Sequence, residues 1–439
     1  DPRSTVQKNT RFGLNQEKKM SYKGIAYLRR KLSVKRVRVL TRYKYYEMKE
    51  TKRDPGKVIP QQLKDDYYTT LGWCAKAVDS LADRLSFNGF ENDNFDLTSI
   101  FNMNNPDVLI DSAILSALIS SCCFIYVSPD ADGDTPHMQV IDGANATGIS
   151  DPLTGMLTEG YAVLKRDSET DSPLLEAYFV PGRTDYINNE NHSEYSIPNA
   201  AEYPLLVPII YRPDAKRPFG HSRISRACMN LQDKAKTTLT RADITAEFYS
   251  FPQKYAVGLS DDIEVDSQKA SISSFLQFSK DEDGDHPTLG QFTQQNMEPH
   301  ISQFKMYAAE FGGETGLTLD DMGFATENPS SAEAIKACHE NLRLTARKAQ
   351  RTFGSGFLNA GFLASCVRDN YAYKRRQVYL TRATWAPIFE PDAAMLSGIG
   401  DGAIKINQAI PGYFGVNNMQ KLTGIEGDSN GGTAQPNTI

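Results

Sequence analysis

The chain has 439 residues, which is enough for two or three compact modules, because single hydrophobic cores stop growing near about 250–300 residues. Its 48 basic and 54 acidic residues give a formal net charge of −6, which argues against a protein that coats DNA tightly. The longest apolar stretch, residues 113–127, contains serines and is shorter than the roughly 18–20 residues of a membrane span, so no membrane helix is expected.

The N-terminal segment is basic and polar, without the apolar core of a secretory signal peptide, so we expect the protein to act inside a cell or a virion. Its six cysteines show no CxxC pairing and predict free, buried thiols. Lysines and arginines then crowd residues 23–44. Five of them form a candidate basic contact surface for DNA, an acidic scaffold or a neighbouring subunit: Arg29, Arg30, Lys31, Lys35 and Arg36. The alternative is an ordinary solvated helix face.

The first half of the chain predicts an α+β module. Apolar spacing predicts a helix from Leu71 that stops at Asn88-Gly89, and a second helix over residues 107–121. β-Rich segments predict strands at 123–128, 138–141, 160–165, 174–180 and 207–211, separated by clusters of Gly, Pro, Asp and Asn.

A change of composition marks the second half, because residues 223–250 contain no Gly or Pro and repeat apolar residues at helical spacing. Pro252 ends this predicted helix. A small insert follows, with strand-like segments at 254–257 and 275–278 and an acidic turn at 281–285. A helix then runs over 296–310 and breaks at Gly312-Gly313.

The C-terminal third begins with a capping-box pattern, in which Ser330 is followed three residues later by Glu333. It predicts a helix over 330–353 that ends before Gly354. Beyond it we expect a basic strand at 373–383, a helix at 392–410 and a mobile tail from Gly424.

Motifs of catalysis are not found. Six scattered histidines give no HExxH or HxxxH spacing, and no GxxxxGK[ST] or GxSxG sequence occurs. We therefore assign no catalytic, cofactor-binding or metal-binding residue, and we do not expect an enzyme. A hydrolase or a nucleic-acid-processing enzyme would need one of these motifs.

Several segments, in order, resemble the portal proteins of tailed bacteriophages, in particular the SPP1-type portal family of siphophages of Gram-positive hosts. These segments are residues 42–46 (RYKYY), 71–90, 207–213 (VPIIYRP), 220–222 (GHS), 231–233 (LQD), 246–254 and 328–335 (NPSSAEAI). The resemblance spans roughly residues 40–400. Each segment alone is weak, but their order and spacing are specific.

The resemblance implies a portal fold and a ring of twelve copies at one capsid vertex, a conduit through which double-stranded DNA is packaged and ejected. The implied parts are an α/β wing (20–220), stem helix 1 (223–250), a clip with β-strands (252–292), stem helix 2 (296–311), a tunnel loop (312–329), a tunnel helix (330–353), and wing completion with a helical crown (354–439). Implied partners are the terminase large subunit, a head-completion adaptor, and the major capsid and scaffolding proteins. The place of action would be the virion, and the host cytoplasm during assembly.

By the same resemblance, charged residues around the tunnel loop are candidates for the channel lining: Asp320, Asp321, Glu333 and Lys336. The acidic turn of the clip is the candidate contact for terminase and adaptor: Asp281, Glu282, Asp283 and Asp285. Both sets could instead be ordinary solvated charges. An alternative for the whole protein is another virion component, such as a minor capsid or head-closure protein, which would not require two stem helices around an insert.

Overall fold

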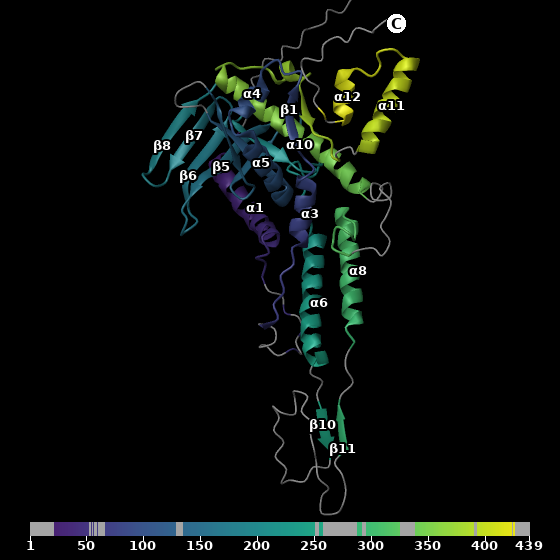
Figure 1. The fold of residues 1–439 in the computed structure, drawn as a ribbon. Helices are drawn as coiled ribbons and strands as arrows, with labels where there is room; N and C mark the ends of the chain where they lie inside the picture. The colour runs from purple at the N-terminus through teal and green to yellow at the C-terminus, as the bar shows by residue number, and fades with distance from the viewer. Residues whose placement is uncertain are drawn as a thin grey trace, which may run out of the picture.

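The computed structural model describes residues 22–51, 54, 56, 59, 66–128, 135–250, 254–257, 288–291, 296–324, 339–389, 393–423 and 425. Figure 1 shows a head of helices and sheets, two long helices that lead away from it side by side, and a small β-hairpin at their far end. The α+β class predicted from the sequence is confirmed.

Two antiparallel sheets form the body of the head. The larger is a five-stranded meander of β4 (Ala146–Ser150), β5 (Leu157–Arg166), β6 (Pro173–Val180), β7 (Arg183–Asn188) and β8 (Ser193–Pro198). The smaller has the order β3-β2-β9, with β2 (Cys122–Ser128) between β3 (His137–Ile141) and β9 (Leu206–Ile210). Strands β4, β7 and β8 were not predicted. β8, for example, is an edge strand with largely exposed side chains, so it lacks an apolar pattern.

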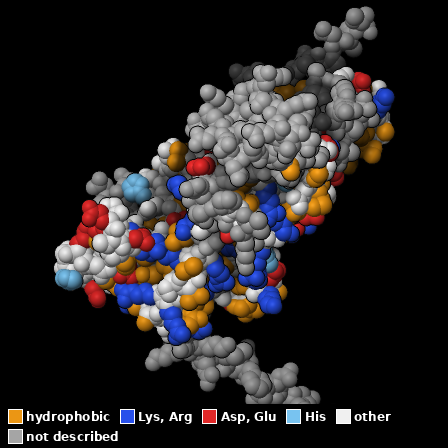
Figure 2. Space-filling model, turned by 90° about the horizontal axis from the view of Figure 1, so that it is seen from below, with side chains coloured by type: hydrophobic (Ala, Val, Ile, Leu, Met, Phe, Trp, Pro, Cys, Tyr) orange, Lys and Arg blue, Asp and Glu red, His pale blue; other side chains and the backbone are white. Residues whose placement is uncertain are grey.

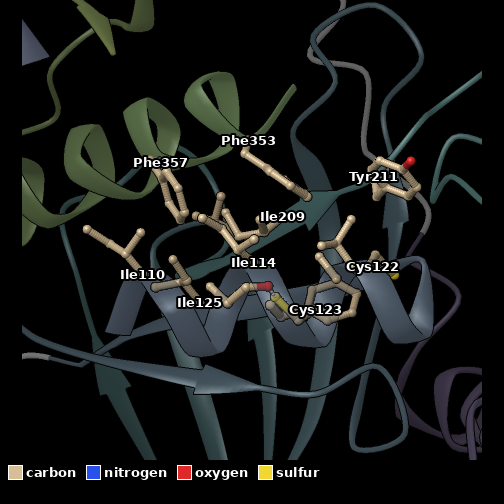
Figure 3. Close-up of a cluster of buried hydrophobic side chains, with 14 of the residues drawn as sticks. Ile110, Ile114, Cys122, Cys123, Ile125, Ile209, Tyr211, Phe353 and Phe357 are labelled. Carbon is tan, nitrogen blue, oxygen red and sulfur yellow. Dashed lines mark hydrogen bonds between the residues drawn. The ribbon is translucent and has the colours of Figure 1, made fainter. Parts of the chain in front are cut away.

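The main core forms around the smaller sheet. Residues 122–127 of β2 are all buried, and since successive strand side chains point to opposite faces, both faces of the strand are covered. The predicted helix 107–121 is confirmed as α5 (Pro106–Ser120), with Pro106 in its first turn. Figure 3 shows Ile110 and Ile114 of α5 close to Ile125 of β2, Ile209 of β9 and Phe357 of the long helix α10.

Helix α10 (Glu340–Arg368) runs through Gly354, so the prediction that it ends before this glycine is wrong. A Cβ atom at Gly354 would lie 2.8 Å from Cβ of Ala383 in strand β12 (Arg382–Trp385). At Gly356 it would lie 2.7 Å from Cδ1 of Ile209. The glycines allow close approach of the helix to two strands instead of ending it. The predicted capping box at Ser330 lies outside the described residues.

Helix α3 (Trp73–Ala82) ends before the predicted stop at Asn88-Gly89, which is a second correction. Those residues lie in strand β1 (Phe87–Glu91), paired antiparallel with β12. Gly89 has a φ of 109°, and a Cβ there would lie 3.1 Å from Cγ2 of Thr98 in helix α4 (Leu97–Asn102). The predicted strand 373–383 is wrong for most of its length, because residues 375–378 form the 3-10 helix η1 (Arg375–Val378) and the strand begins at Arg382.

Helix α1 (Ile25–Tyr46) contains most of the basic segment and lies on the larger sheet. Its Leu28 and Leu32 are buried with Tyr161 and Val163 of β5 in a second, smaller core. This apolar contact turns one face of the helix toward the sheet and leaves the opposite face exposed.

The two helices that lead away from the head, α6 (Arg226–Ser250) and α8 (Glu298–Thr315), are called here the helix pair (Figure 1). With 25 residues, α6 is about 37 Å long. The predicted helix 223–250 is confirmed, with a start three residues later. Helix α8 runs through Gly312 and Gly313 to Thr315 and is capped by Gly316, whose φ is 75°, so the predicted break at the two glycines is wrong.

A hairpin of β10 (Lys254–Val257) and β11 (Thr288–Gln291) stands at the far end of the helix pair. The predicted strand 254–257 is thereby confirmed, whereas 275–278 lies outside the described residues. At the head end, the predicted helix 392–410 is confirmed as α11 (Ala393–Ala409), followed by α12 (Val416–Thr423). Apart from Ile425, the tail from Gly424 lies outside the described residues.

Candidate functional site

The contact between α6 and α8 combines small buried residues with polar side chains. Ala235 and Ala308 have no exposed surface, which allows the two helices to approach closely. Thr238 Oγ1 donates to Gln303 Oε1 at 3.0 Å. Farther along, Thr245 Oγ1 and His300 Nε2 are 3.2 Å apart. Because hydrogen bonds between side chains need particular partners, they fix the register of the helix pair.

Arg223 and Trp73 join the helix pair to the head. The buried guanidinium of Arg223 donates to the backbone oxygen of Ala77 at 3.1 Å and also to that of Thr315, at the end of α8. The ring of Trp73 lies 5.2 Å from Phe304 and 5.3 Å from Phe311, measured between centroids. Both contacts tie α8 to helix α3, so the helix pair is anchored to the head.

A buried ion pair joins the segment after α1 to α6. Lys236 Nζ donates to Glu50 Oε1 at 2.7 Å and to the hydroxyl of Tyr68 at 3.1 Å. Gln232 Nε2 donates to the same carboxylate oxygen at 3.0 Å, and its Oε1 accepts the backbone N–H of Cys74 at 2.8 Å. Burial opposes the charge of Lys236, but the hydrogen bonds to Glu50 and Tyr68 outweigh it and raise the pKa of this lysine.

The residues predicted to line a channel are only partly described. Asp321 is half-buried, and its carboxylate accepts the backbone N–H and the hydroxyl of Thr318 at 2.8 and 2.9 Å. Since Thr318 Oγ1 in turn accepts the N–H of Asp321, the two residues stabilise a turn after α8. Asp320 is exposed beside it. Glu333 and Lys336 lie outside the described residues.

The acidic turn predicted as a partner contact, residues 281–285 with Asp281, Glu282, Asp283 and Asp285, also lies outside the described residues. The hairpin β10–β11 that flanks it is antiparallel, with Lys254 opposite Gln291 and Val257 opposite Thr288. Val257 is 62% exposed. An apolar strand residue is therefore accessible at the far end of the helix pair.

Two of the five predicted basic contact residues form ion pairs with the larger sheet. Nε and Nη2 of Arg29 donate to the two carboxylate oxygens of Glu176 at 2.8 and 3.0 Å. This bidentate contact raises the pKa of Arg29. Nη2 of Arg36 lies 2.5 Å from Oδ2 of Asp171. These arginines hold α1 on the sheet.

Lys31 and Lys35 also turn toward the head. Nζ of Lys31 donates to the backbone oxygen of Gly148 at 2.5 Å, and Nζ of Lys35 lies 3.1 Å from Sγ of Cys122. Arg30 is exposed on the outer face of α1. The sequence could not separate these cases, because the partners of the basic residues lie about a hundred positions away along the chain.

The part of the chain that the structure describes holds no group of three or more His, Cys, Asp or Glu side chains that could bind a metal ion. None of its described helices is long and apolar enough to cross a membrane. Cys74, Cys122, Cys123, Cys228 and Cys366 are free and buried, as predicted. Burial raises the pKa of Cys366 to about 11, so its thiol is not ionised at neutral pH.

Comparison with known proteins gives a family and two curated relatives. The family model described as "Phage portal protein, SPP1 Gp6-like" matches residues 26–386. The portal protein of Mycobacterium phage L5 is 23% identical over 338 residues, which are 72% of this chain and 68% of that protein. The portal protein of Mycobacterium phage D29 is 24% identical over 342 residues, 73% of this chain and 69% of that protein.

Solved structures give more distant matches. A chain of the virion of a native gene transfer agent particle aligns with a TM-score of 0.43 and 11% identity, over 90% of this chain and 99% of that one. A chain from the neck of the native particle, computed with C12 symmetry, aligns with the same TM-score and identity. The alignment covers 88% of this chain and 99% of that one.

Proposed function

The chain belongs to the SPP1 Gp6-like family of phage portal proteins, and we propose that its copies form a ring around a channel through which double-stranded DNA enters and leaves a capsid. The resemblance predicted from the sequence is confirmed by the family match over residues 26–386. The alternative of a minor capsid or head-closure protein is set aside for the same reason. As a portal protein, the chain is a structural component of the virion.

The observation that carries the proposal is the helix pair with its terminal hairpin. Two long helices, locked in register by Thr238 and Gln303, project from the head and bring the hairpin β10–β11 to their far end. We assign the helix pair as the stem, the hairpin and residues 252–292 as the clip, and the two-sheet head as the wing. Helices α11 and α12 would form the crown. Copies of a stiff helix pair arranged around an axis would build the wall of a channel.

The outer face of α8 supports packing against a second copy. Met306, Ala309 and Gly313 are exposed on α8 at a spacing of three and four residues, which places them along one side of the helix, and Met306 is 48% exposed. An apolar side chain beside two small residues leaves room for another helix to approach. In a ring, each α8 would be covered by the stem of the neighbouring copy.

Passage of DNA requires a wall that does not hold phosphates tightly. The formal net charge of −6 fits this requirement. Of the described channel candidates, Asp320 is exposed and Asp321 is half-buried, with its carboxylate accepting from Thr318. Glu333 and Lys336 remain candidates of the same surface.

We propose twelve copies per ring, assembled in the host cytoplasm and then built into the capsid vertex with the major capsid and scaffolding proteins. The clip would dock the terminase large subunit during packaging and a head-completion adaptor afterwards, through the acidic residues 281–285. The exposed Val257 on the neighbouring hairpin would add an apolar contact to this docking.

Native mass spectrometry of the purified full chain tests the proposed assembly. A dominant species of twelve subunits, or a narrow range of closely related ring sizes, is the expected result. The double variant Met306→Glu and Ala309→Glu should shift the species to monomers, because it would bury unpaired carboxylates between copies. The matched variant Met103→Glu, at an exposed methionine of the head, should keep the oligomer. Monomers of the unchanged protein at micromolar concentration would contradict the proposal.

A further inference from the structure

Helix α1 carries a stripe of cations that differs from the predicted basic surface. It consists of Lys31, Lys35, Arg38 and Arg42. These positions follow the spacing i, i+4, i+7 and i+11, so they lie along one side of the helix. Nζ of Lys31 lies 5.0 Å from the centre of the Phe219 ring, and Nε of Arg42 donates to the backbone oxygen of Ile224 at 3.3 Å. The stripe therefore runs beside the segment that joins β9 to α6.

That joining segment and the first residue of α6 add exposed cations, namely Arg212, Lys216, Arg217 and Arg226. Asp214 lies on the same segment, but its Oδ2 is 2.6 Å from Nε2 of His221, and its Oδ1 accepts the backbone N–H of Arg217 at 2.6 Å. None of the ion pairs between described residues joins Arg38, Arg42, Arg217 or Arg226 to a carboxylate. We call the stripe together with Arg217 and Arg226 the cationic surface.

The charges of the cationic surface act on one another. Burial, and then the charges of Arg38, Arg217 and Arg226, lower the pKa of Arg42. Burial, and then the charge of Lys35, lower the pKa of Lys31. Helix α6 begins at Arg226 without an acidic residue in its first turn, so the helix end adds positive potential. Such a group of like charges is stabilised when an anion binds it.

Apolar side chains accompany these charges. Val34 and Val37 are 61% and 68% exposed on the outer face of α1, and Tyr27, about two turns before Val34, is 44% exposed. A nucleic-acid backbone would contact the cations but would gain nothing from the valines. A protein segment that carries both carboxylates and apolar side chains would use both kinds of surface.

We infer that the cationic surface and the neighbouring valines form a docking site for an acidic, partly apolar segment of a partner protein. The carboxylates of this segment pair with Arg38, Arg217 and Arg226, and its apolar side chains cover Val34 and Val37. Figure 2, viewed from the side of the helix pair, shows Lys and Arg side chains gathered on this underside of the head. The inference rests on these side chains and does not depend on ring formation.

Fluorescence anisotropy with the full chain tests the inference. The probe is a labelled helical peptide of about 20 residues with Glu and Leu on one face. The charge-reversal variant Arg38→Glu, Arg217→Glu and Arg226→Glu should weaken its binding at least about tenfold, and Val34→Ser with Val37→Ser should weaken it about threefold or more. The matched variant Arg376→Glu with Arg382→Glu, at exposed arginines beyond α10, should bind as the unchanged chain does. Circular dichroism checks that each variant is folded.

Three results would overturn the inference. The first is absence of peptide binding to the unchanged chain at about 100 μM. The second is that a DNA duplex of about 20 base pairs binds more tightly than the peptide, that the charge-reversal variant loses this binding, and that the valine variant keeps it. This result would identify a nucleic-acid site. The third is loss of the oligomer in the charge-reversal variant, which would identify a second copy as the occupant. A chain that binds the peptide but forms no ring would refute the proposed function alone.

Discussion

Glu50→Ala should destabilise the junction between the segment after α1 and helix α6. The Glu50 side chain is 3% exposed and that of Lys236 is 10% exposed, so the substitution leaves a buried ammonium without its carboxylate. Removal of one partner from a buried pair costs about 3–5 kcal/mol. Because Lys236 keeps its hydrogen bond to Tyr68, we expect about 3 kcal/mol. For a chain of 439 residues that free energy corresponds to a fall in Tm of about 3–5 °C.

Differential scanning calorimetry at one scan rate measures the change. Glu50→Gln keeps an acceptor for one donor, so its Tm should lie between the Tm of Glu50→Ala and that of the unchanged chain. Glu47→Ala is the matched control, since the Glu47 side chain is 45% exposed and pairs with an exposed lysine. Its Tm should move by less than about 1–2 °C. Equal Tm values for Glu50→Ala and Glu47→Ala would refute the reasoning that the buried pair holds the junction.

Two further predictions concern the packing of the head. Gly354→Ala should lower the free energy of unfolding by about 1–3 kcal/mol, because the new methyl group would lie 2.8 Å from Cβ of Ala383, an atom fixed to the strand backbone. Gly398→Ala in α11 has open space and should be neutral or stabilising, so equal destabilisation in calorimetry would contradict the contact argument. Although burial alone would raise the pKa of Glu176, its hydrogen bonds, chiefly from Arg29, hold that pKa below its ordinary value. The stabilisation that this lowered pKa provides is complete above the pKa of Glu176 in the unfolded chain, about 4.3. It is lost as the pH falls through the lower pKa of Glu176 in the folded chain. Between pH about 6 and about 3.5, the Tm of the unchanged chain should therefore fall more than the Tm of Glu176→Gln. If the two plots of Tm against pH ran parallel, they would count against this contact.

The sequence predicted the long helices well wherever apolar spacing alone decides the structure. Residues 223–250 carry no helix breaker, and α6 matches them closely. The errors in the long helices occur at glycines. The sequence predicts that helices stop at Gly312 and Gly354, but a Cβ at Gly312 would lie 2.7 Å from the backbone oxygen of Leu317, so this glycine permits a close contact. A sequence shows the glycine but not the neighbour that requires it.

For charged residues too, the sequence shows the residue but not its neighbours in the fold. Arg29 reads as a free cation on a basic helix, yet its partner Glu176 lies on a sheet strand far along the chain. Conversely, Arg217 and Arg226 joined no predicted surface, because only folding brings their segment beside Arg38 and Arg42. Local sequence predicts which residues are charged, whereas tertiary contacts decide which charges stay exposed.

The most direct test of the proposed conduit is electron microscopy of the purified chain, with class averages examined for rotational symmetry and for the direction of the helix pair. We expect rings whose central hole is at least about 20 Å wide, enough for duplex DNA. In side views the helix pair should run roughly along the ring axis and carry the hairpin to one end. Compact monomers or dimers, or rings with a closed centre, would contradict the account.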